Sequence, residues 1–200
     1  RMLKLKEPIY DLVNFSFKTL MAFALILSIF SCFFSYEIMD FRYDNYILES
    51  SNIFLVLMLC FICVSSTYIY GTLLTANGNL FYLNIVAAFG VVLNVVLNLI
   101  LIPKYDAFGS AVASLVTQFL TGLAQIFLCV YIFKFNLYRT FFKLLLFIVG
   151  LVLFTYYIKG IEMYLYYKLI MYLIFSLIWV FIMQIVKISD FSMLIQNRLK

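Results

Sequence analysis

Residues 81–132 read FYLNIVAAFGVVLNVVLNLILIPKYDAFGSAVASLVTQFLTGLAQIFLCVYI, in which two uncharged apolar runs, Phe81–Ile102 and Phe108–Ile132, are joined by PKYDA. At 1.5 Å of rise per residue, each run would form a helix of about 33–38 Å. A bilayer core of about 30 Å needs no more than that. Because lipid offers no hydrogen-bond partners, a chain crossing it must satisfy its backbone groups within a helix. The stretch therefore predicts a helical hairpin in a membrane.

The rest of the chain extends this pattern. Four more apolar runs flank the hairpin, at Thr19–Ser35, Ile53–Leu74, Phe141–Tyr157 and Leu169–Val186. Hydrophobic residues make up 66% of the chain and charged residues 12%, whereas soluble domains carry about 25% charged residues. This composition excludes an ordinary soluble domain, and its hydrophobicity excludes a disordered chain. We expect an all-α integral membrane protein, with a bundle of about six transmembrane helices at 19–186. Residues 1–18 would be a cytoplasmic or interfacial segment, and 187–200 a cytoplasmic tail.

The basic residues predict an orientation. With the N-terminus in the cytoplasm, the inner side would hold Arg1, Lys4, Lys6, Lys18, Lys134, Arg139, Lys143, Lys187, Arg198 and Lys200. The outer side would hold Arg42, Lys104, Lys159 and Lys168. Because basic residues concentrate on the cytoplasmic side of membrane proteins, both termini are predicted to be cytoplasmic. A bacterial inner (plasma) membrane is the natural setting. In a membrane protein the net charge of +5 reflects the basic residues of the loops rather than a nucleic-acid site, and we expect no nucleic-acid partner.

Several kinds of chemistry lack the residues they need. The chain has no His, and the pair Cys60 and Cys63 has no second pair to complete a zinc site. We interpret all four cysteines as small apolar packing residues. The six runs contain no Asp, Glu or Arg, so they hold neither an ion-coupling carboxylate nor a nucleophile with its base. We therefore expect no enzyme activity, no metal and no cofactor.

Two runs carry polar stripes. Ser110, Ser114, Thr117, Thr121 and Gln125 follow one another at intervals of 4, 3, 4 and 4 residues, which places them on one helix face. The preceding run carries Asn84, Asn94 and Asn98. Buried Asn needs a hydrogen-bond partner or water, so both faces are expected to point away from lipid. They could line a polar cavity, or they could hydrogen-bond and pack neighbouring helices. The small pair Gly109 and Ala113 favours packing, and both interpretations remain open.

The stretch Tyr70–Thr117 also resembles a known family. It contains ANGN at 76–79, LNVVLNLILIP at 93–103 and FGSAVAS at 108–114. In this order and spacing, these pieces resemble the C-terminal region of polysaccharide (O-antigen type) flippases, within the multidrug/oligosaccharidyl-lipid/polysaccharide exporter superfamily. The six-run plan extends the resemblance to the rest of the chain.

The resemblance implies a carrier of undecaprenyl-linked oligosaccharides, such as O-antigen or capsule repeat units. Such carriers have about 12–14 spans in two lobes that alternate in access around a central cavity. This chain would be the C-terminal lobe, its partners being the lipid-linked oligosaccharide and the missing N-terminal lobe. The implied cavity residues are Asn94, Asn98, Ser114, Thr117, Thr121 and Gln125. Gly109 and Ala113 would supply the close helix packing. The chain opens with Arg1 rather than Met, so we expect it to be part of a longer protein.

The sequence departs from the family pattern in one respect and leaves two alternatives. No Lys or Arg lies deep in the spans, although a diphosphate-linked substrate would favour one. A multidrug or small-molecule antiporter of the same superfamily is the first alternative. A membrane-embedded glycosyl- or acyltransferase subunit is the second, and it would use the loop acids Glu37, Asp40, Asp44 and Glu49.

Overall fold

The computed structural model describes residues 9–185, and it is helical throughout this range apart from short connections. Its helices are α2 (Ile9–Phe33), α3 (Ser35–Arg42), α4 (Ile47–Ala76), α5 (Leu80–Phe133), α6 (Tyr138–Lys159) and α7 (Leu165–Ile182). The part of the chain that the structure describes contains no strand. The all-α fold predicted from the sequence is confirmed.

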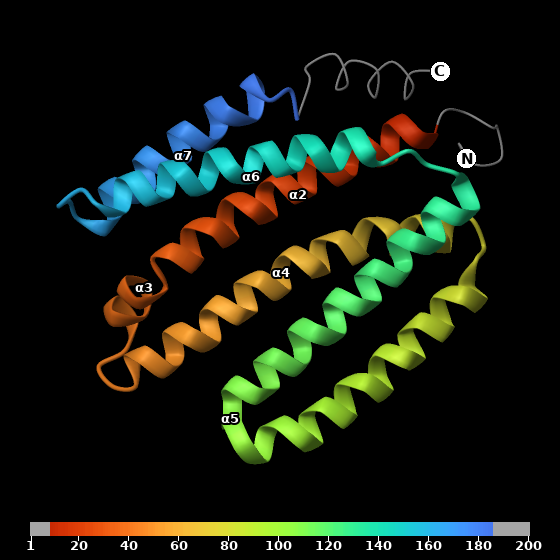
Figure 1. Ribbon diagram of the computed structural model, residues 1–200, viewed down its shortest axis with the longest axis horizontal. Coiled ribbons are helices and arrows are strands. Elements are labelled where there is room, and N and C mark those ends of the chain that lie inside the picture. The colour runs from red at the N-terminus through yellow and green to blue at the C-terminus, as the bar shows by residue number, and fades with distance from the viewer. Residues whose placement is uncertain (1–8, 186–200) are drawn as a thin grey trace.

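Helix α5 folds back on itself at Asp106. The 54 residues of α5 contain one non-helical residue, Asp106, with φ 48° and ψ −130°. Pro103 lies just before this bend, and Gly109 just after it is packed against the backbone of Leu101. Each arm is about 40 Å long, and Figure 1 shows the two arms running back along each other. The predicted hairpin is therefore present, and α2, α4, the two arms of α5, α6 and α7 form the expected bundle of about six helices.

The helices run back and forth between two ends of the bundle (Figure 1). One end holds the start of α2, the turn at 77–79 and the connection at 134–137. The other end holds α3, the bend of α5 and the connection at 160–164. Gly78 has φ +82° in the first of these turns, a conformation that glycine adopts at little cost. The first end carries the predicted inner residues Lys134 and Arg139.

Helices α2 and α6 lie parallel and in constant register. Tyr10 Oη donates to the carbonyl of Asn136 at 2.7 Å, and Thr140 Oγ1 donates to Asn14 Oδ1 at 2.6 Å. At the far end, Lys159 Nζ donates to the carbonyl of Phe33 at 2.9 Å. All three bonds join residues 126 apart in sequence. The residue offset between the two helices is therefore the same at both ends.

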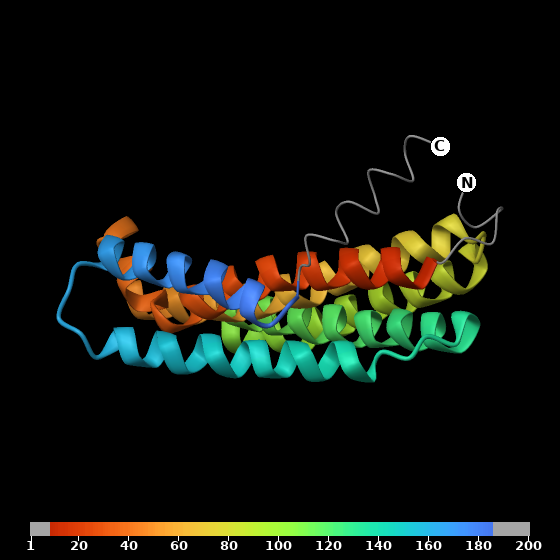
Figure 2. The same ribbon diagram turned by 90° about the horizontal axis from the view of Figure 1, so that it is seen from above.

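Helix α7 completes an aromatic core with α2 and α6. Tyr172 Oη donates to the carbonyl of Ile26 at 2.9 Å, and both Tyr172 and Phe147 are fully buried. Phe154 and Phe175 stack with ring centroids 3.7 Å apart. Figure 2 shows α6 and the second arm of α5 in one layer, with α2 and α7 on the opposite side. Large buried aromatic side chains therefore hold α2, α6 and α7 together.

Some boundaries differ from those predicted. Helix α2 begins at Ile9, ten residues before the predicted span at Thr19, because the side chains of Val13 and Phe17 are buried in the core. The predicted loop Tyr36–Asn52 contains α3, and α4 begins inside it at Ile47. Residues 1–8, Val186 and the predicted tail 187–200 lie outside the described residues.

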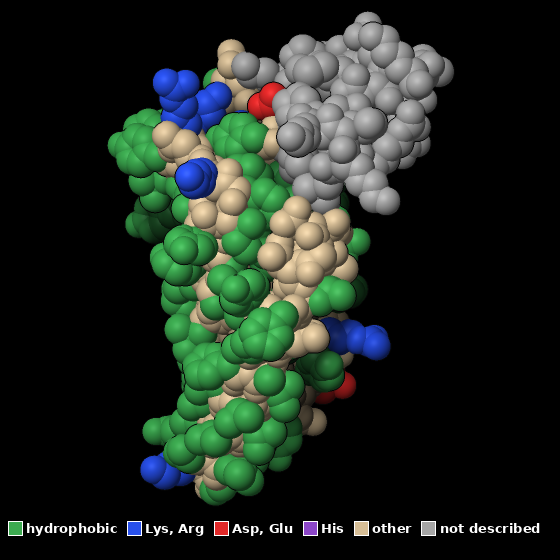
Figure 3. Space-filling model, turned by 90° about the vertical axis from the view of Figure 1, so that its right-hand side faces the viewer, with side chains coloured by type: hydrophobic (Ala, Val, Ile, Leu, Met, Phe, Trp, Pro, Cys, Tyr) green, Lys and Arg blue, Asp and Glu red, His purple; other side chains and the backbone are tan. Residues whose placement is uncertain are grey.

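The surface of the bundle suits a lipid environment. Five helices are long and apolar enough to cross a membrane, and the longest of them is the folded α5. Large apolar side chains are exposed on them, including Phe89, Leu99 and Phe127 at 56%, 72% and 70%. Figure 3 shows a face covered largely by hydrophobic side chains, with the few charged ones at its margins. The chain has the properties of a multi-pass membrane protein.

Candidate polar groove in the α4–α5 half

A groove of about 510 Å³ lies among α4 and the two arms of α5. Its lining residues are Thr67, Val86, Ala87, Gly90, Val91, Asn94, Val95, Ser114, Thr117, Gln118, Thr121 and Gln125. Seven of the twelve carry a hydroxyl or amide group, and none carries a charge. They come from the middle portions of their helices, so the groove lies near half-depth in an otherwise apolar bundle. This arrangement can hydrogen-bond a polar, uncharged group at the level of the lipid tails.

The second arm of α5 supplies most of these polar groups. Thr117 Oγ1 donates to the carbonyl of Ala113, and Thr121 Oγ1 donates to the carbonyl of Thr117, both at 2.8 Å. Such bonds to the preceding helical turn are the usual way a threonine satisfies its hydroxyl hydrogen inside a helix. The hydroxyl oxygens keep their lone pairs, so this wall of the groove offers hydrogen-bond acceptors.

The two asparagines of the first arm act as a pair. Asn94 Nδ2 donates to Thr117 Oγ1 at 3.4 Å, which links the two arms across the groove. Asn98 Nδ2 donates to the backbone oxygen and to Oδ1 of Asn94, at 2.9 Å each. Asn98 therefore fixes the side chain of Asn94 from one turn below, and Asn98 is not itself part of the lining.

Glycines bring the three helices close together. A Cβ atom added at Gly90 would lie 2.7 Å from Thr121 Cγ2, and one added at Gly122 would lie 3.3 Å from Thr67 Cγ2. At Gly71 the nearest atom would be Gln125 Oε1, at 3.1 Å. Close backbone approach through small residues is the usual way helices pack in a membrane. These glycines therefore let α4 and the two arms of α5 approach closely around the groove.

Two polar atoms at or beside the groove have no hydrogen-bond partner. Gln125 Oε1 and Asn98 Oδ1 are buried, and neither accepts a hydrogen bond. An unpaired amide oxygen costs about 1–3 kcal/mol when it is shielded from water. A ligand or a water molecule with a donor group would remove this cost at Gln125, which lines the groove.

The structure brings most of the sequence-predicted residues together. Asn94, Ser114, Thr117, Thr121 and Gln125 all line the groove, and Asn98 bonds to Asn94 beside it. Gly109 and Ala113 are buried within α5, with Gly109 at the bend. Three residues of the predicted stripes, Asn84, Asn98 and Ser110, are not among the lining residues.

Sequence reasoning missed the wall that α4 contributes. Thr67 lines the groove, Gly71 touches Gln125, and the carbonyl of Cys63 lies near Gly122. A usable signal was present, because Cys60, Cys63, Thr67 and Gly71 are spaced by 3, 4 and 4 residues. That spacing puts four small side chains on one face of α4, and this face meets the second arm of α5.

The cysteines and acids do not form a metal centre. Among residues 9–185, no group of three or more His, Cys, Asp or Glu could hold a metal ion. All four cysteines are free thiols, and Cys129 Sγ lies 3.6 Å from the carbonyl of Tyr70. Cys60 and Cys129 are buried among apolar neighbours.

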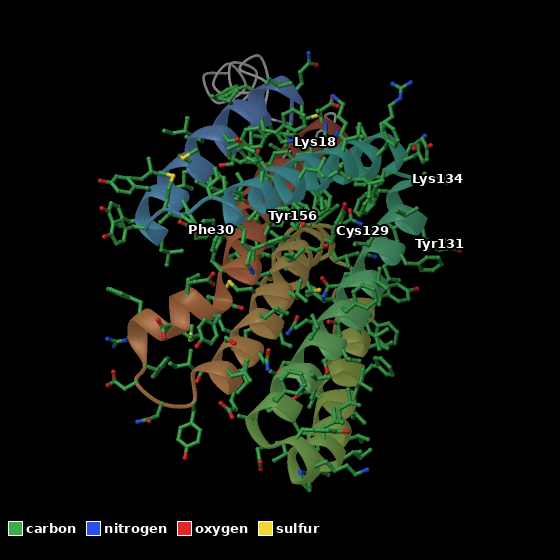
Figure 4. The ribbon with its side chains drawn as sticks, turned by 60° about the vertical axis from the view of Figure 1, so that its left-hand side comes forward. Lys18, Phe30, Cys129, Tyr131, Lys134 and Tyr156 are labelled. Atoms are coloured by element: carbon green, nitrogen blue, oxygen red, sulfur yellow. The ribbon has the colours of Figure 1, made fainter. Side chains whose placement is uncertain are left out.

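Tyrosines and lysines gather at the ends of the helices. Tyr156, Tyr157 and Tyr164 are 74%, 66% and 73% exposed near the connection at 160–164. At the opposite end, Figure 4 shows Lys134 where α5 ends and Tyr131, 75% exposed, projecting away from the bundle. Tyrosine and lysine at helix ends are typical of the membrane–water interface, and the groove lies between these two levels.

Comparison with known proteins adds no relative: no family model matches the chain, and no curated protein or solved structure matches it significantly.

Proposed function

We propose that the chain is the C-terminal half of a carrier that moves undecaprenyl-linked oligosaccharides across the bacterial inner membrane by alternating access. The observation that carries this proposal is the uncharged polar groove at mid-depth in an apolar bundle. Secondary transporters bind their substrates near the bilayer midplane, between two bundles of helices. The sugar part of such a lipid, unlike its diphosphate, is rich in hydroxyl groups, which suits a wall of threonine, asparagine and glutamine side chains.

The resemblance of residues 70–117 to polysaccharide flippases supports the same proposal. Its most characteristic piece, LNVVLNLILIP at 93–103, contains Asn94 and Asn98. Asn94 lines the groove and bonds to Thr117 of the facing arm. O-antigen and capsule repeat units are the substrates that this resemblance suggests.

A second lobe would cover the groove. The groove is open along one side of the α4–α5 half, and its polar groups would cost free energy against lipid tails. A matching N-terminal lobe of the same transporter would enclose them between two bundles. We propose that this lobe is the chain's protein partner.

The decisive experiment is export in a flippase-deficient bacterium. Surface polysaccharide should return when the chain is co-expressed with a matching N-terminal lobe, and it should stay absent with the chain alone. Export by the chain alone would overturn the half-transporter proposal and indicate a homodimeric carrier. Absence of export from a correctly assembled pair of lobes would overturn the flippase assignment.

A matched pair of asparagine variants tests the groove itself. Asn94→Leu should abolish export without lowering the amount of protein, because it removes a polar group from the path. Asn84→Leu is the control, since Asn84 is exposed and lies outside the groove. Equal export by the two variants would show that the groove is not part of the proposed transport path.

The proposed orientation can be tested with single cysteines in a background without the four native ones. An impermeant thiol reagent added outside the cell should label Asp44→Cys and Glu162→Cys. It should not label Asn77→Cys or Asn136→Cys, which lie at the opposite end of the bundle. Labelling in the reverse sense would show that both termini are outside.

A further inference from the structure

We infer that the groove recognises its ligand through hydrogen-bond acceptors centred on Thr121 and Gln125, with Gly71 positioning the Gln125 side chain. The ligand group would then be a neutral donor of several hydrogen bonds, which is the chemistry of sugar hydroxyls. This inference rests on the proposed function and assigns the sugar-recognition part of it to particular atoms.

The direction of the hydrogen bonds supports an acceptor wall. The hydroxyl hydrogens of Thr117 and Thr121 are committed to backbone carbonyls of their own helix. Thr121 Oγ1 can therefore only accept a further bond from a ligand. Thr117 Oγ1 already accepts from Asn94, so the free acceptor capacity lies one turn further along, toward Gln125.

Gln125 supplies the second acceptor on the same helix face. It follows Thr121 by four residues, so the two side chains are neighbours on the helix surface. Gln125 belongs to the groove lining, and its Oε1 atom is buried against Gly71 and lacks a partner. A ligand hydroxyl group that reaches this atom would give it a hydrogen-bond donor, and a ligand without donors would leave it unpaired.

The absence of charge in the groove further limits which chemical groups of a ligand can bind there. None of the lining side chains is ionisable within the physiological range. A phosphate or an ammonium group would find no counter-charge there, and burying an unpaired charge is far more costly than burying a hydroxyl. Neutral hydroxyls match both the uncharged lining of the groove and the acceptor oxygens of Thr121 and Gln125.

Gly71 sets the position of Gln125. Gln125 Oε1 lies 3.1 Å from the place where a Cβ at Gly71 would be. An alanine there would press on the amide oxygen and displace it by a few tenths of an ångström. Gly122 offers a matched control on the same helix contact, because a Cβ there would meet Thr67 Cγ2 at 3.3 Å and would not meet Gln125.

The test compares two lipids that differ only in the sugar. The purified full chain in nanodiscs is equilibrated with undecaprenyl diphosphate, or with the same lipid carrying a neutral disaccharide, and both Kd values are measured. The ratio of the two values is the sugar preference. Gln125→Leu should lower this preference about tenfold, the loss of one hydrogen bond to a buried acceptor. Gly71→Ala should lower it in the same direction, and Gly122→Ala should leave it unchanged.

A conservative variant separates recognition from folding. Gln125→Asn keeps a neutral amide oxygen on this side chain and should retain more of the sugar preference than Gln125→Leu does. If Gln125→Leu does not fold, Gly71→Ala carries the test alone. A sugar preference that survives both Gln125→Leu and Gly71→Ala overturns this inference and leaves the flippase proposal standing. A wild-type chain that shows no sugar preference also overturns this inference, whereas the flippase proposal is judged by the export experiment.

Discussion

The α2–α6–α7 half and the α4–α5 half of the bundle are held together in different ways. In α2, 44% of the most apolar stretch is buried inside the protein, whereas the corresponding value for α5 is 6%. The first half packs large aromatic side chains such as Phe147 and Tyr172. The second half packs small residues such as Gly90, Ala113 and Gly122, and it keeps polar side chains between its helices.

This difference separates a structural region from a region suited to binding. Lipid tails are as apolar as leucine, so helices in a membrane associate through packing and hydrogen bonds rather than through the hydrophobic effect. Large interlocking rings give a rigid contact. Small residues let helices approach closely and leave room beside them, and in the α4–α5 half that room is polar. We therefore expect mutations to damage stability in the first half and ligand recognition in the second.

The largest contrast should appear when a phenylalanine is truncated in each half. Phe147→Ala should destabilise the protein by about 2 kcal/mol, the cavity part of the loss in soluble cores, because Phe147 is fully buried. Phe89→Ala should change stability by less than about 0.5 kcal/mol, since Phe89 is 56% exposed. Unfolding in detergent by a denaturing surfactant measures both. Equal losses would show that the two halves are equally packed.

Glycine-to-alanine substitutions should show a smaller contrast. At Gly150 a Cβ would collide with the indole ring of Trp179, which also donates to the carbonyl of Phe147. Overpacking of this kind costs about 1–3 kcal/mol, so the melting temperature of Gly150→Ala should fall. At Gly122 a Cβ would lie 3.3 Å from a threonine methyl and 3.8 Å from the carbonyl of Cys63, so Gly122→Ala should be near neutral. A stable Gly150→Ala protein would mean that α6 and α7 can separate freely.

A stabilising change is expected at the bend of α5. Asp106 has φ 48° and ψ −130°, which costs a residue other than glycine about 1–3 kcal/mol. Asp106→Gly should raise stability by about 1 kcal/mol, and Asp106→Ala should not, because alanine keeps the strained Cβ. Thermal unfolding of the two variants distinguishes backbone strain from loss of the carboxylate. A gain with alanine as well would assign the effect to the charge.

The smallest expected effect concerns hydrogen bonds between helices. The bond from Thr140 to Asn14 is 2.6 Å long and joins α6 to α2. A double-mutant cycle with Thr140→Val and Asn14→Leu should give a coupling of about 0.6 kcal/mol, typical of such bonds in membrane proteins. The bond from Asn94 to Thr117 is 3.4 Å long and should couple more weakly. A stronger coupling between Asn94 and Thr117 would indicate that Asn94 stabilises the fold rather than serving ligand binding in the groove.

The sequence predicts the spans well because their signal is local. Runs of apolar residues identify the helices, and the PKYDA connection at 103–107 marks the hairpin bend to within a few residues of Asp106. The spacing of Ser114, Thr117, Thr121 and Gln125 predicts a polar face. This polar face lines the groove because all four side chains lie on one side of a single helix.

Other features depend on contacts between distant segments and leave no local signal. The parallel register of α2 and α6 rests on pairs such as Tyr10 with Asn136, 126 residues apart. The first ten helical residues of α2, at 9–18, lie outside the span predicted from the sequence, because the uninterrupted apolar run begins only after Lys18. The role of Gly71 emerges only from its position against Gln125.

The most direct test of a hydrated polar groove in the α4–α5 half is the accessibility of single cysteines in membrane vesicles. Ser114 lines the groove and is half-buried, whereas Leu120 is 39% exposed and lies outside it. In a background without native cysteines, a small water-soluble thiol reagent should modify Ser114→Cys rapidly. It should leave Leu120→Cys unmodified, because that side chain faces lipid. Rapid modification of Leu120→Cys with none at Ser114→Cys would contradict the presence of a polar groove between the helices.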